Sequence, residues 1–461
     1  MKIWFDVEDL FEYARSVSRP SGIQRLSYEM YAALRVLDPA RIGFVRHDMR
    51  SGTMLVSDWA EVEAVFARMT QARLPGGGRH STGGQPSLMH SGLGRMPILR
   101  AAAQRMPREV RQPLGDAMRA QLGVLRNLGR AARALPEAFR GQQGAPAAAP
   151  AQGQALREVA RPGDVLASFG SPWSLPDYPG LVARTLDGSG LRYAILIYDL
   201  IPVIRPEYCD AALVRMFTAY AEGCLPQAEA VLAISEATVR DTIAWSRRQG
   251  LSLRATPRAI PIGTGFSHAT PAPVLPAGLA PGGYALFVST IEARKNHALA
   301  FRAWRRLLDE LPPQQVPTLV FAGRVGWMVE DLMQQVQNAH QLDGKLVLVE
   351  SPDDATLAAL YQGARFTLFP SLYEGWGLPV SESLSFGKVC LAASTTSVPE
   401  AGGAFCLYHD PDSVTEAVAL YRRAIAEPSL IEGLEARIAA EHRPTPWSAT
   451  ARAVLDALPP G

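Results

Sequence analysis

Apolar and polar positions alternate along this chain in two different periods. Short apolar runs such as YAILIYD and TLVFAG have the length of buried strands, whereas longer stretches repeat apolar residues every three or four positions, as helices do. The pattern begins with a strand at KIWFDV, a loop that contains glycine, and a helix through Leu26, Met30 and Leu34. Strands that alternate with helices predict parallel sheets covered on both faces, so the expected fold class is α/β.

A proline-rich segment, HATPAPVLPAGLAPGG, separates two regions of this alternation. We therefore predict an N-terminal Rossmann-like domain over residues 1–265 and a second one over residues 266–440, followed by a helix within 441–461. In doubly wound domains, ligands bind outside the carboxyl ends of the strands. The two domains are accordingly expected to face a shared cleft.

Residues 74–160 interrupt the first domain as an insert with Gly-, Pro- and Ala-rich ends, which are typical of flexible linkers. Between these ends, residues 95–140 contain ten arginines and three acids, and Met118, Leu125, Ala132 and Phe139 repeat every seven residues. This pattern predicts a basic amphipathic helix. Such a helix either packs on the first domain or lies on an anionic membrane surface.

Composition excludes several classes of protein. The formal net charge of +2 gives no field suited to nucleic acid, and the four cysteines have no zinc or disulfide spacing. The first residues, MKIWFDVEDLFEYA, are acidic where a signal peptide is basic, and no apolar run is long enough to span a bilayer. We expect a protein that is cytoplasmic or peripheral to the inner face of the cytoplasmic membrane.

The segment FPSLYEGWGLPVSESLSFG carries the strongest chemical signal. It places Glu374 and Glu382 on either side of a Gly-Trp-Gly turn and the start of a helix. Glycines let a ligand approach the backbone, and a carboxylate accepts hydrogen bonds from neighbouring hydroxyl groups. The pair therefore suits a polyhydroxylated ligand. The alternative is two solvated acids that favour the positive end of a helix.

Further polar residues follow other predicted strands. Arg294 and Lys295, in STIEARKNH, can neutralise a pyrophosphate unless they form only a solvated basic loop. In FAGRVGW, Gly323 allows close approach of a ligand to the backbone, and Arg324 either reaches a phosphate or base of that ligand or lies on the surface. Asp199, in YDLIPVI, ends a buried strand, where it faces the cleft or caps a turn.

These motifs resemble the retaining family 4 glycosyltransferases of the GT-B fold, in the branch of bacterial O-antigen and capsule mannosyltransferases. The resemblance covers residues 1–73 and 161–458 and includes RPSGIQR, SVPEAGG and TPWSATARAVLDAL, the last resembling the family's helix that crosses back to the first domain. It implies catalytic roles for Lys295, Arg294, Glu374 and Asp199. It implies donor-binding roles for Gly22, Gly323, Arg324, Gly375, Trp376, Gly377, Leu378 and Glu382.

Within that resemblance, Glu374 and the backbone after it would hold the transferred sugar, and Glu382 would bind the ribose. Two positions depart from the pattern. Tyr198 stands where the branch has His, so the role of that His does not transfer. Thr290 lies near the place of the family's upstream Arg, so either Arg294 supplies the missing cation or pyrophosphate binding rests mainly on Lys295.

The resemblance implies a retaining, metal-independent transferase with no cofactor. Its donor would be a nucleotide-sugar, with GDP-mannose favoured, and it would transfer mannose or a related deoxysugar. The acceptor would be a glycan or a lipid-linked glycan in surface polysaccharide synthesis. One alternative is a nucleotide-sugar epimerase of the same fold, which would turn over the donor without an acceptor. Another is an inactive glycan-binding homologue, which would bind the donor without transfer.

Overall fold

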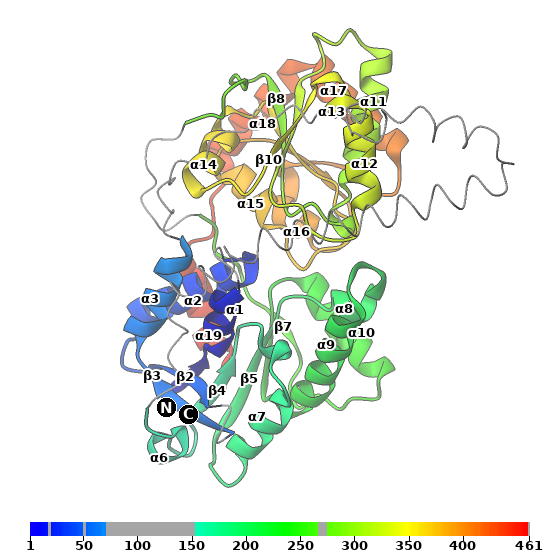
Figure 1. The fold of residues 1–461 in the computed structure, drawn as a ribbon. Coiled ribbons are helices and arrows are strands. Elements are labelled where there is room, and N and C mark those ends of the chain that lie inside the picture. The colour runs from blue at the N-terminus through cyan, green and yellow to red at the C-terminus, as the bar shows by residue number, and fades with distance from the viewer. Residues whose placement is uncertain (17–19, 49–51, 71–152, 266–273, 460–461) are drawn as a thin grey trace, which may run out of the picture. The chain divides into compact units, whose positions relative to one another are not determined.

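The computed structural model describes residues 1–16, 20–48, 52–70, 153–265 and 274–459. The predicted basic helix at 95–140 lies outside these residues, as does most of the predicted insert 74–160. The described part of the chain contains two sheets. The strands of the first sheet end at Ala259 and those of the second begin at Tyr284 (Figure 1).

The first sheet has seven strands in the order β3-β2-β1-β4-β5-β6-β7. Its neighbours pair in parallel except β3, which runs antiparallel to β2 at the edge. The strands are β1 (Ile3–Asp6), β2 (Ile42–Asp48), β3 (Thr53–Ser57), β4 (Val165–Ser168), β5 (Arg192–Ile197), β6 (Ala230–Ala233) and β7 (Arg258–Ala259). The central strands β1, β4 and β6 are buried along their whole length, as expected for a parallel sheet with helices on both faces.

The helices around this sheet begin at residues that the sequence favours for helix starts. Ser21, Asp210 and Ser235 each accept a backbone N–H with the side chain, which satisfies a free donor of the first turn. The helices are α1 (Glu8–Ser16), α2 (Gly22–Leu37), α3 (Trp59–Thr70), α6 (Leu156–Val159), η3 (Pro172–Ser174), α7 (Tyr178–Leu186), α8 (Ile201–Ile204), η4 (Pro206–Tyr208), α9 (Ala211–Cys224), η5 (Leu225–Gln227) and α10 (Glu236–Arg248).

The second sheet has six parallel strands in the order β10-β9-β8-β11-β12-β13. They are β8 (Tyr284–Val288), β9 (Thr318–Ala322), β10 (Leu346–Val349), β11 (Phe366–Phe369), β12 (Cys390–Ala393) and β13 (Leu407–His409). The helical elements are η6 (Ala293–Lys295), α11 (His297–Glu310), α12 (Glu330–Asn338), α13 (His340–Asp343), α14 (Asp354–Gly363), α15 (Leu378–Ser385), α16 (Val398–Gly402), η7 (Gly403–Phe405), α17 (Val414–Ala426) and α18 (Pro428–Glu441).

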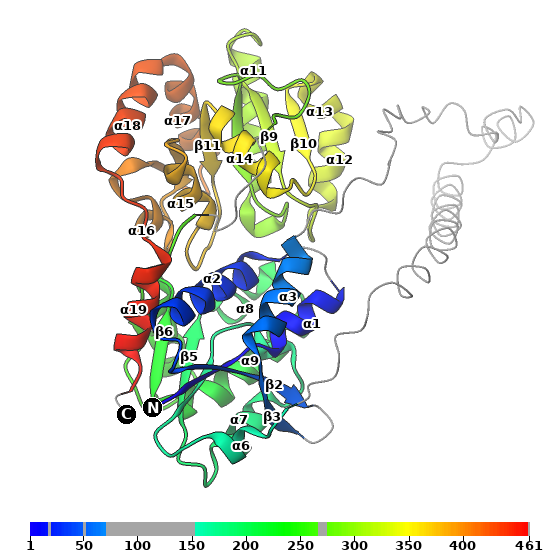
Figure 2. The same cartoon turned by 90° about the vertical axis from the view of Figure 1, so that its left-hand side faces the viewer.

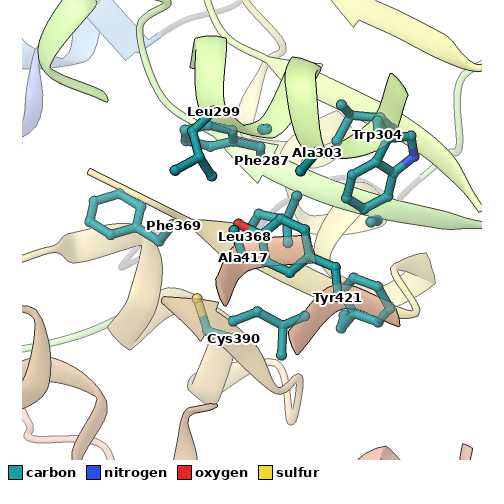
Figure 3. Close-up of a cluster of buried hydrophobic side chains, with 14 of the residues drawn as sticks. Phe287, Leu299, Ala303, Trp304, Leu368, Phe369, Cys390, Ala417 and Tyr421 are labelled. Atoms are coloured by element: carbon teal, nitrogen blue, oxygen red, sulfur yellow. The ribbon is translucent and has the colours of Figure 1, made fainter. Parts of the chain in front are cut away.

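The core of the second sheet is an apolar cluster between the strands and α11 and α17 (Figure 3). Phe287 and Leu368 come from the strands, Trp304 from α11 and Tyr421 from α17, and all four are almost fully buried. Burying one large apolar side chain contributes about 1.5–3 kcal/mol, so this cluster fixes the strand ends that carry the candidate site. Trp304 Nε1 donates to the Pro317 carbonyl at 2.9 Å, which satisfies the polar atom in the core.

The last helix, α19 (Trp447–Ala457), packs against α2 and β6 of the first sheet (Figure 2). The indole of Trp447 lies so close to Gly263 that a side chain at this position would overlap with the ring. Thr264 N also donates to the Thr445 carbonyl at 3.0 Å. These contacts attach the end of the chain to the segment that follows β7.

The predicted α/β class is confirmed by the two doubly wound sheets. The pattern did not indicate β2 and β3, because Arg46, His47 and Asp48 interrupt the apolar run there. Among the described residues, no helix combines the length and the apolar character needed to cross a membrane.

Candidate active site

The two charged motifs lie at the carboxyl ends of neighbouring strands. β8 ends before STIEARKNH and β11 ends before the Gly-Trp-Gly turn, and β8 and β11 are paired in the second sheet. Because parallel strands end at the same edge of a sheet, this pairing brings both motifs together. Asn296, with φ of 64°, ends the short η6 turn, and its side chain donates to the carbonyls of Pro370 and Pro411. It thereby fixes the two loops beneath the site.

The carboxylate of Glu374 is the centre of this cluster. It accepts hydrogen bonds from Lys295 Nζ at 2.6 Å and from Ser371 Oγ at 2.6 Å, and it pairs with Arg294 Nη1 at 2.9 Å. Burial alone would raise the pKa of Glu374, but the charges of Arg294 and Lys295 and these hydrogen bonds lower it to about 2. Glu374 is therefore ionised and compensated inside the protein.

Arg294 and Lys295 differ in how they are held. The guanidinium of Arg294 also donates to Glu292 Oε1 at 2.7 Å and to the Tyr373 carbonyl at 2.6 Å, so it bridges three protein acceptors. The ammonium group of Lys295 is a compact charge on a flexible stem next to Glu374. Of the two predicted cations, Lys295 is thus the one better able to move toward a bound anion.

Asp199 belongs to the same electrostatic environment. Burial raises the pKa of its carboxyl, and the charge of Arg294 opposes this shift in part. Its Oδ1 accepts the backbone N–H of Ile201 at 3.0 Å, so Asp199 caps a turn as well as lying near the cluster. Tyr198, beside it, donates from its hydroxyl to the Phe169 carbonyl at 2.6 Å. The Tyr198 side chain is therefore held by the first sheet rather than by the Glu374 cluster.

The glycine-rich turn after Glu374 lies very close to the backbone of Tyr198. A Cβ atom at Gly375 would overlap with the carbonyl oxygen of Tyr198, so only glycine fits there. Gly377, with φ of 112°, is the N-cap residue that precedes α15, and Trp376 Nε1 donates to Ser381 Oγ at 3.0 Å. Leu378, the first residue of α15, lies beside Gly22, where an added Cβ would make ordinary contact at 3.5 Å.

Two polar residues support this turn: Ser397, which begins the SVPEAGG segment, and Thr396, which precedes it. The sequence analysis assigned no role to either residue. Ser397 Oγ donates to the carbonyls of Glu374 and Trp376 at 2.9 and 3.0 Å. Thr396 Oγ1 accepts the backbone N–H of Glu374 at 3.1 Å. The polar pair Thr396-Ser397, shortly before Pro399, was the signal available for them.

Glu382 lies on α15, where Tyr361 donates to its Oε2 at 2.8 Å. Burial raises the pKa of Glu382, while the Tyr361 hydrogen bond and the charge of Arg25 oppose the shift. Arg25, from the RPSGIQR segment, forms an ion pair with Asp354 at 2.9 Å. A carboxylate held at one oxygen in this way keeps its other oxygen available to accept hydrogen bonds from hydroxyl groups.

The loop after β9 contains the remaining predicted residues, Gly323 and Arg324. At Gly323, with φ of 154°, a Cβ would overlap with the Ser289 carbonyl, so the glycine allows this loop to pack on the loop after β8. Arg324 is exposed, and its charge lowers the pKa of Tyr13 against the effect of burial. Its position is thus near α1 of the first sheet. Among the described residues, no group of three or more His, Cys, Asp or Glu side chains is arranged to hold a metal ion.

Comparison with known proteins finds similarity to glycosyltransferases in part of the sequence. Residues 281–437 match the family described as glycosyl transferases group 1. The crystal structure of HepE from Anabaena, in complex with UDP and glucose, aligns with a TM-score of 0.56 at 13% identity, over 99% of this chain and 98% of that one. The chain has the GT-B fold, as predicted.

Two mannosyltransferases of Escherichia coli are similar in sequence. O-antigen chain mannosyltransferase B is 28% identical over 283 residues, which cover 60% of this chain and 73% of that protein. Serotype-specific mannosyltransferase WbdA is 26% identical over 219 residues, which cover 45% of this chain and 26% of WbdA. Together with the matched domain, these relatives support a glycosyltransferase.

Proposed function

We propose that the chain is a retaining, metal-independent glycosyltransferase of family 4. It transfers mannose or a related deoxysugar from a nucleotide-sugar to a glycan or lipid-linked glycan acceptor of a surface polysaccharide. GDP-mannose is the favoured donor because the similar proteins are mannosyltransferases, one of them named for the O-antigen chain. The observation that carries the proposal is the convergence of Lys295 and Arg294 on Glu374, beside a turn that only glycine fits.

In this reaction the bond between the anomeric carbon and the diphosphate oxygen breaks, and its electron pair stays on the diphosphate. Lys295, and Arg294 behind it, would stabilise that charge as it develops. The acceptor oxygen forms the new bond on the same face of the sugar, and its proton passes to the leaving phosphate. Glu374 would position the sugar, and Asp199 would orient the sugar or the acceptor. Each of these groups is already held by other protein groups, which favours catalysis by preorganised charge.

Thermal-shift measurements with GDP-, UDP- and dTDP-sugars test the donor assignment directly. A ligand present at 100 times its dissociation constant stabilises a protein by about 2.7 kcal/mol. We expect GDP-mannose to give the largest shift and to release GDP when an oligomannoside is added. The absence of a shift with all three nucleotide classes would contradict the proposal.

Donor affinity should depend on Glu382. We expect Glu382→Ala to weaken GDP binding by roughly 10- to 150-fold, because charge-assisted hydrogen bonds contribute about 1.5–3 kcal/mol. Titration calorimetry with GDP measures this change. Glu432→Ala, at an exposed position of α18, is the matched control. Equal GDP affinity in wild type and Glu382→Ala, with equal melting temperatures, would exclude the ribose role.

Membrane contact through residues 95–140 is a separate expectation. Anionic headgroups favour a basic segment by about 1 kcal/mol per close Lys or Arg. We expect the full chain to sediment with anionic vesicles at low salt, and a deletion of residues 86–150 to stay in solution. Equal sedimentation of both proteins, or binding that ignores lipid charge, would refute a membrane role for the segment.

A further inference from the structure

A pocket of about 370 Å³ lies at the carboxyl edge of the first sheet. It is formed by α1, which follows β1, and by the turn that follows β4. The polar residues that line it are Asp9, Glu12, Tyr13, Ser171 and Ser174, and a leucine and a proline complete it. Its size falls at the small end of the range of about 300–1,000 Å³ for small-molecule sites. None of its lining residues belongs to the donor assignments above.

The carboxylate of Asp9 is built into the wall of this pocket. The residue is 4% exposed, and its Oδ2 accepts the backbone N–H of Ser171 at 2.8 Å and the Ser171 hydroxyl at 3.0 Å. A Cβ at Gly170 would overlap with the Asp9 carboxylate, so a glycine is needed to bring the turn this close. Gln24 Nε2 donates to Ser171 Oγ at 3.0 Å and holds the hydroxyl in place.

The charge of Asp9 is compensated differently from that of its neighbours. Glu8 is paired with Arg46 at 2.8 Å and Asp6 with His47 at 2.7 Å, whereas Asp9 forms no ion pair within the described part of the chain. Burial raises the pKa of Asp9 to about 6, although the hydrogen bonds from Ser171 act in the opposite direction. A buried carboxylate with acceptor capacity to spare is stabilised by additional hydroxyl or N–H donors.

The surrounding residues narrow the chemistry of the ligand. The lining contains no Lys, Arg or His, which disfavours a phosphate or another anion. Both hydrogen bonds that Ser171 donates to the Asp9 side chain go to Oδ2, so Oδ1 keeps capacity to accept further hydrogen bonds. A neutral molecule rich in hydroxyl groups matches this lining.

Tyr198 connects the rim of the pocket to the donor turn. Its hydroxyl donates to the carbonyl of Phe169, immediately before Gly170 and Ser171. Its own carbonyl oxygen lies against Gly375, so the Tyr198 backbone faces the turn after Glu374. One residue thus contacts both the segment just before Ser171 and the loop assigned to the transferred sugar.

We propose that this pocket is a subsite for a neutral sugar ring of the acceptor glycan, in which Asp9 accepts hydrogen bonds from sugar hydroxyl groups. This assignment rests on the proposed function and specifies its acceptor side. Tyr13 and Ser174 border the same space and supply further hydrogen-bonding groups. Asp9 acts here in recognition, and the reaction itself needs no proton transfer to it.

The test compares sugar binding and nucleotide binding in the full chain. The probes are methyl α-mannoside, α-mannobiose and GDP, each followed by titration calorimetry, with ligand-observed NMR for the weaker sugars. Asp9→Asn removes the charge, and Ser174→Phe fills the pocket from an exposed position without touching the buried network. Asp187→Asn, at an exposed residue at the end of α7, is the matched control.

We expect Asp9→Asn and Ser174→Phe to weaken mannobiose binding at least tenfold and to leave GDP binding within a factor of two, with Asp187→Asn unchanged in both. Wild-type mannobiose affinity in both pocket variants would overturn the subsite, as would a wild type that binds neither sugar probe. If the wild type binds the sugar probes but does not bind GDP, the donor assignment is refuted and the subsite assignment is retained.

Discussion

Replacing Lys295 by alanine is expected to lower turnover by a factor of about 10²–10³, the range seen when one charge-stabilising group is removed from an active site. The ammonium group lies 2.6 Å from Glu374 at the carboxyl end of β8, where a departing diphosphate would gain charge. Because that charge is largest in the transition state, GDP affinity should fall less than turnover does. Steady-state transfer from GDP-mannose, combined with GDP calorimetry, measures both quantities.

Lys388→Ala is the matched control for this experiment, since Lys388 pairs with Glu435 at 3.4 Å in the same half of the chain. Its turnover should equal that of the wild type. If Lys295→Ala retains turnover within a factor of about two, which is about 0.4 kcal/mol, the leaving-group role is incorrect. Equal losses in GDP affinity and in turnover would point to ground-state binding instead.

Replacing Glu374 by glutamine is expected to destabilise the protein by roughly 3 kcal/mol at pH 7. The pKa of Glu374 is lowered from its usual value of 4.5 to about 2, so the folded state favours the ionised form. Its contribution is therefore complete above about pH 4.5 and is lost as the pH falls toward 2. The substitution also leaves the charges of Lys295 and Arg294 without their shared partner.

Urea unfolding of wild type and Glu374→Gln at pH 7 and pH 3 tests this dependence of stability on pH. The difference between the two midpoints should be large at pH 7 and should shrink at pH 3. Glu432→Gln, at an exposed site on α18, should match the wild type at both values. A constant difference across the pH range would show that packing, rather than charge, accounts for the loss.

The sequence predicted those parts of the candidate site that directly follow a buried strand. Apolar runs located β8 and β11, whose parallel pairing brings their carboxyl ends to one edge, but only the family resemblance assigned Lys295 and Glu374 to the same site. Their pairing at 2.6 Å was not predicted, because a two-residue motif does not fix side-chain directions. The engagement of Arg294 by three acceptors was equally hidden, since one of them is a backbone carbonyl.

The pocket around Asp9 could not be found from sequence pattern. Asp9 and Ser171 are 162 positions apart, and their contact depends on β1 pairing with β4 across an intervening insert. The acidic start of the chain served only to exclude a signal peptide. Gln24 lies within the RPSGIQR segment, but its side chain is turned to Ser171, which no local period reveals.

The buried charge of Asp9 destabilises the folded state. With a pKa of about 6 in place of the usual 3.8, the native state holds this proton more tightly than the unfolded chain does, so stability decreases as the pH rises between these values and stays lower above them. Hydroxyl groups of a bound sugar would supply hydrogen bonds that favour the ionised form, so occupation of the pocket near pH 6 would release a proton. At neutral pH the ionised Asp9 thus lowers the free energy of unfolding of the protein without a bound sugar. Selection for stability alone would therefore replace this residue.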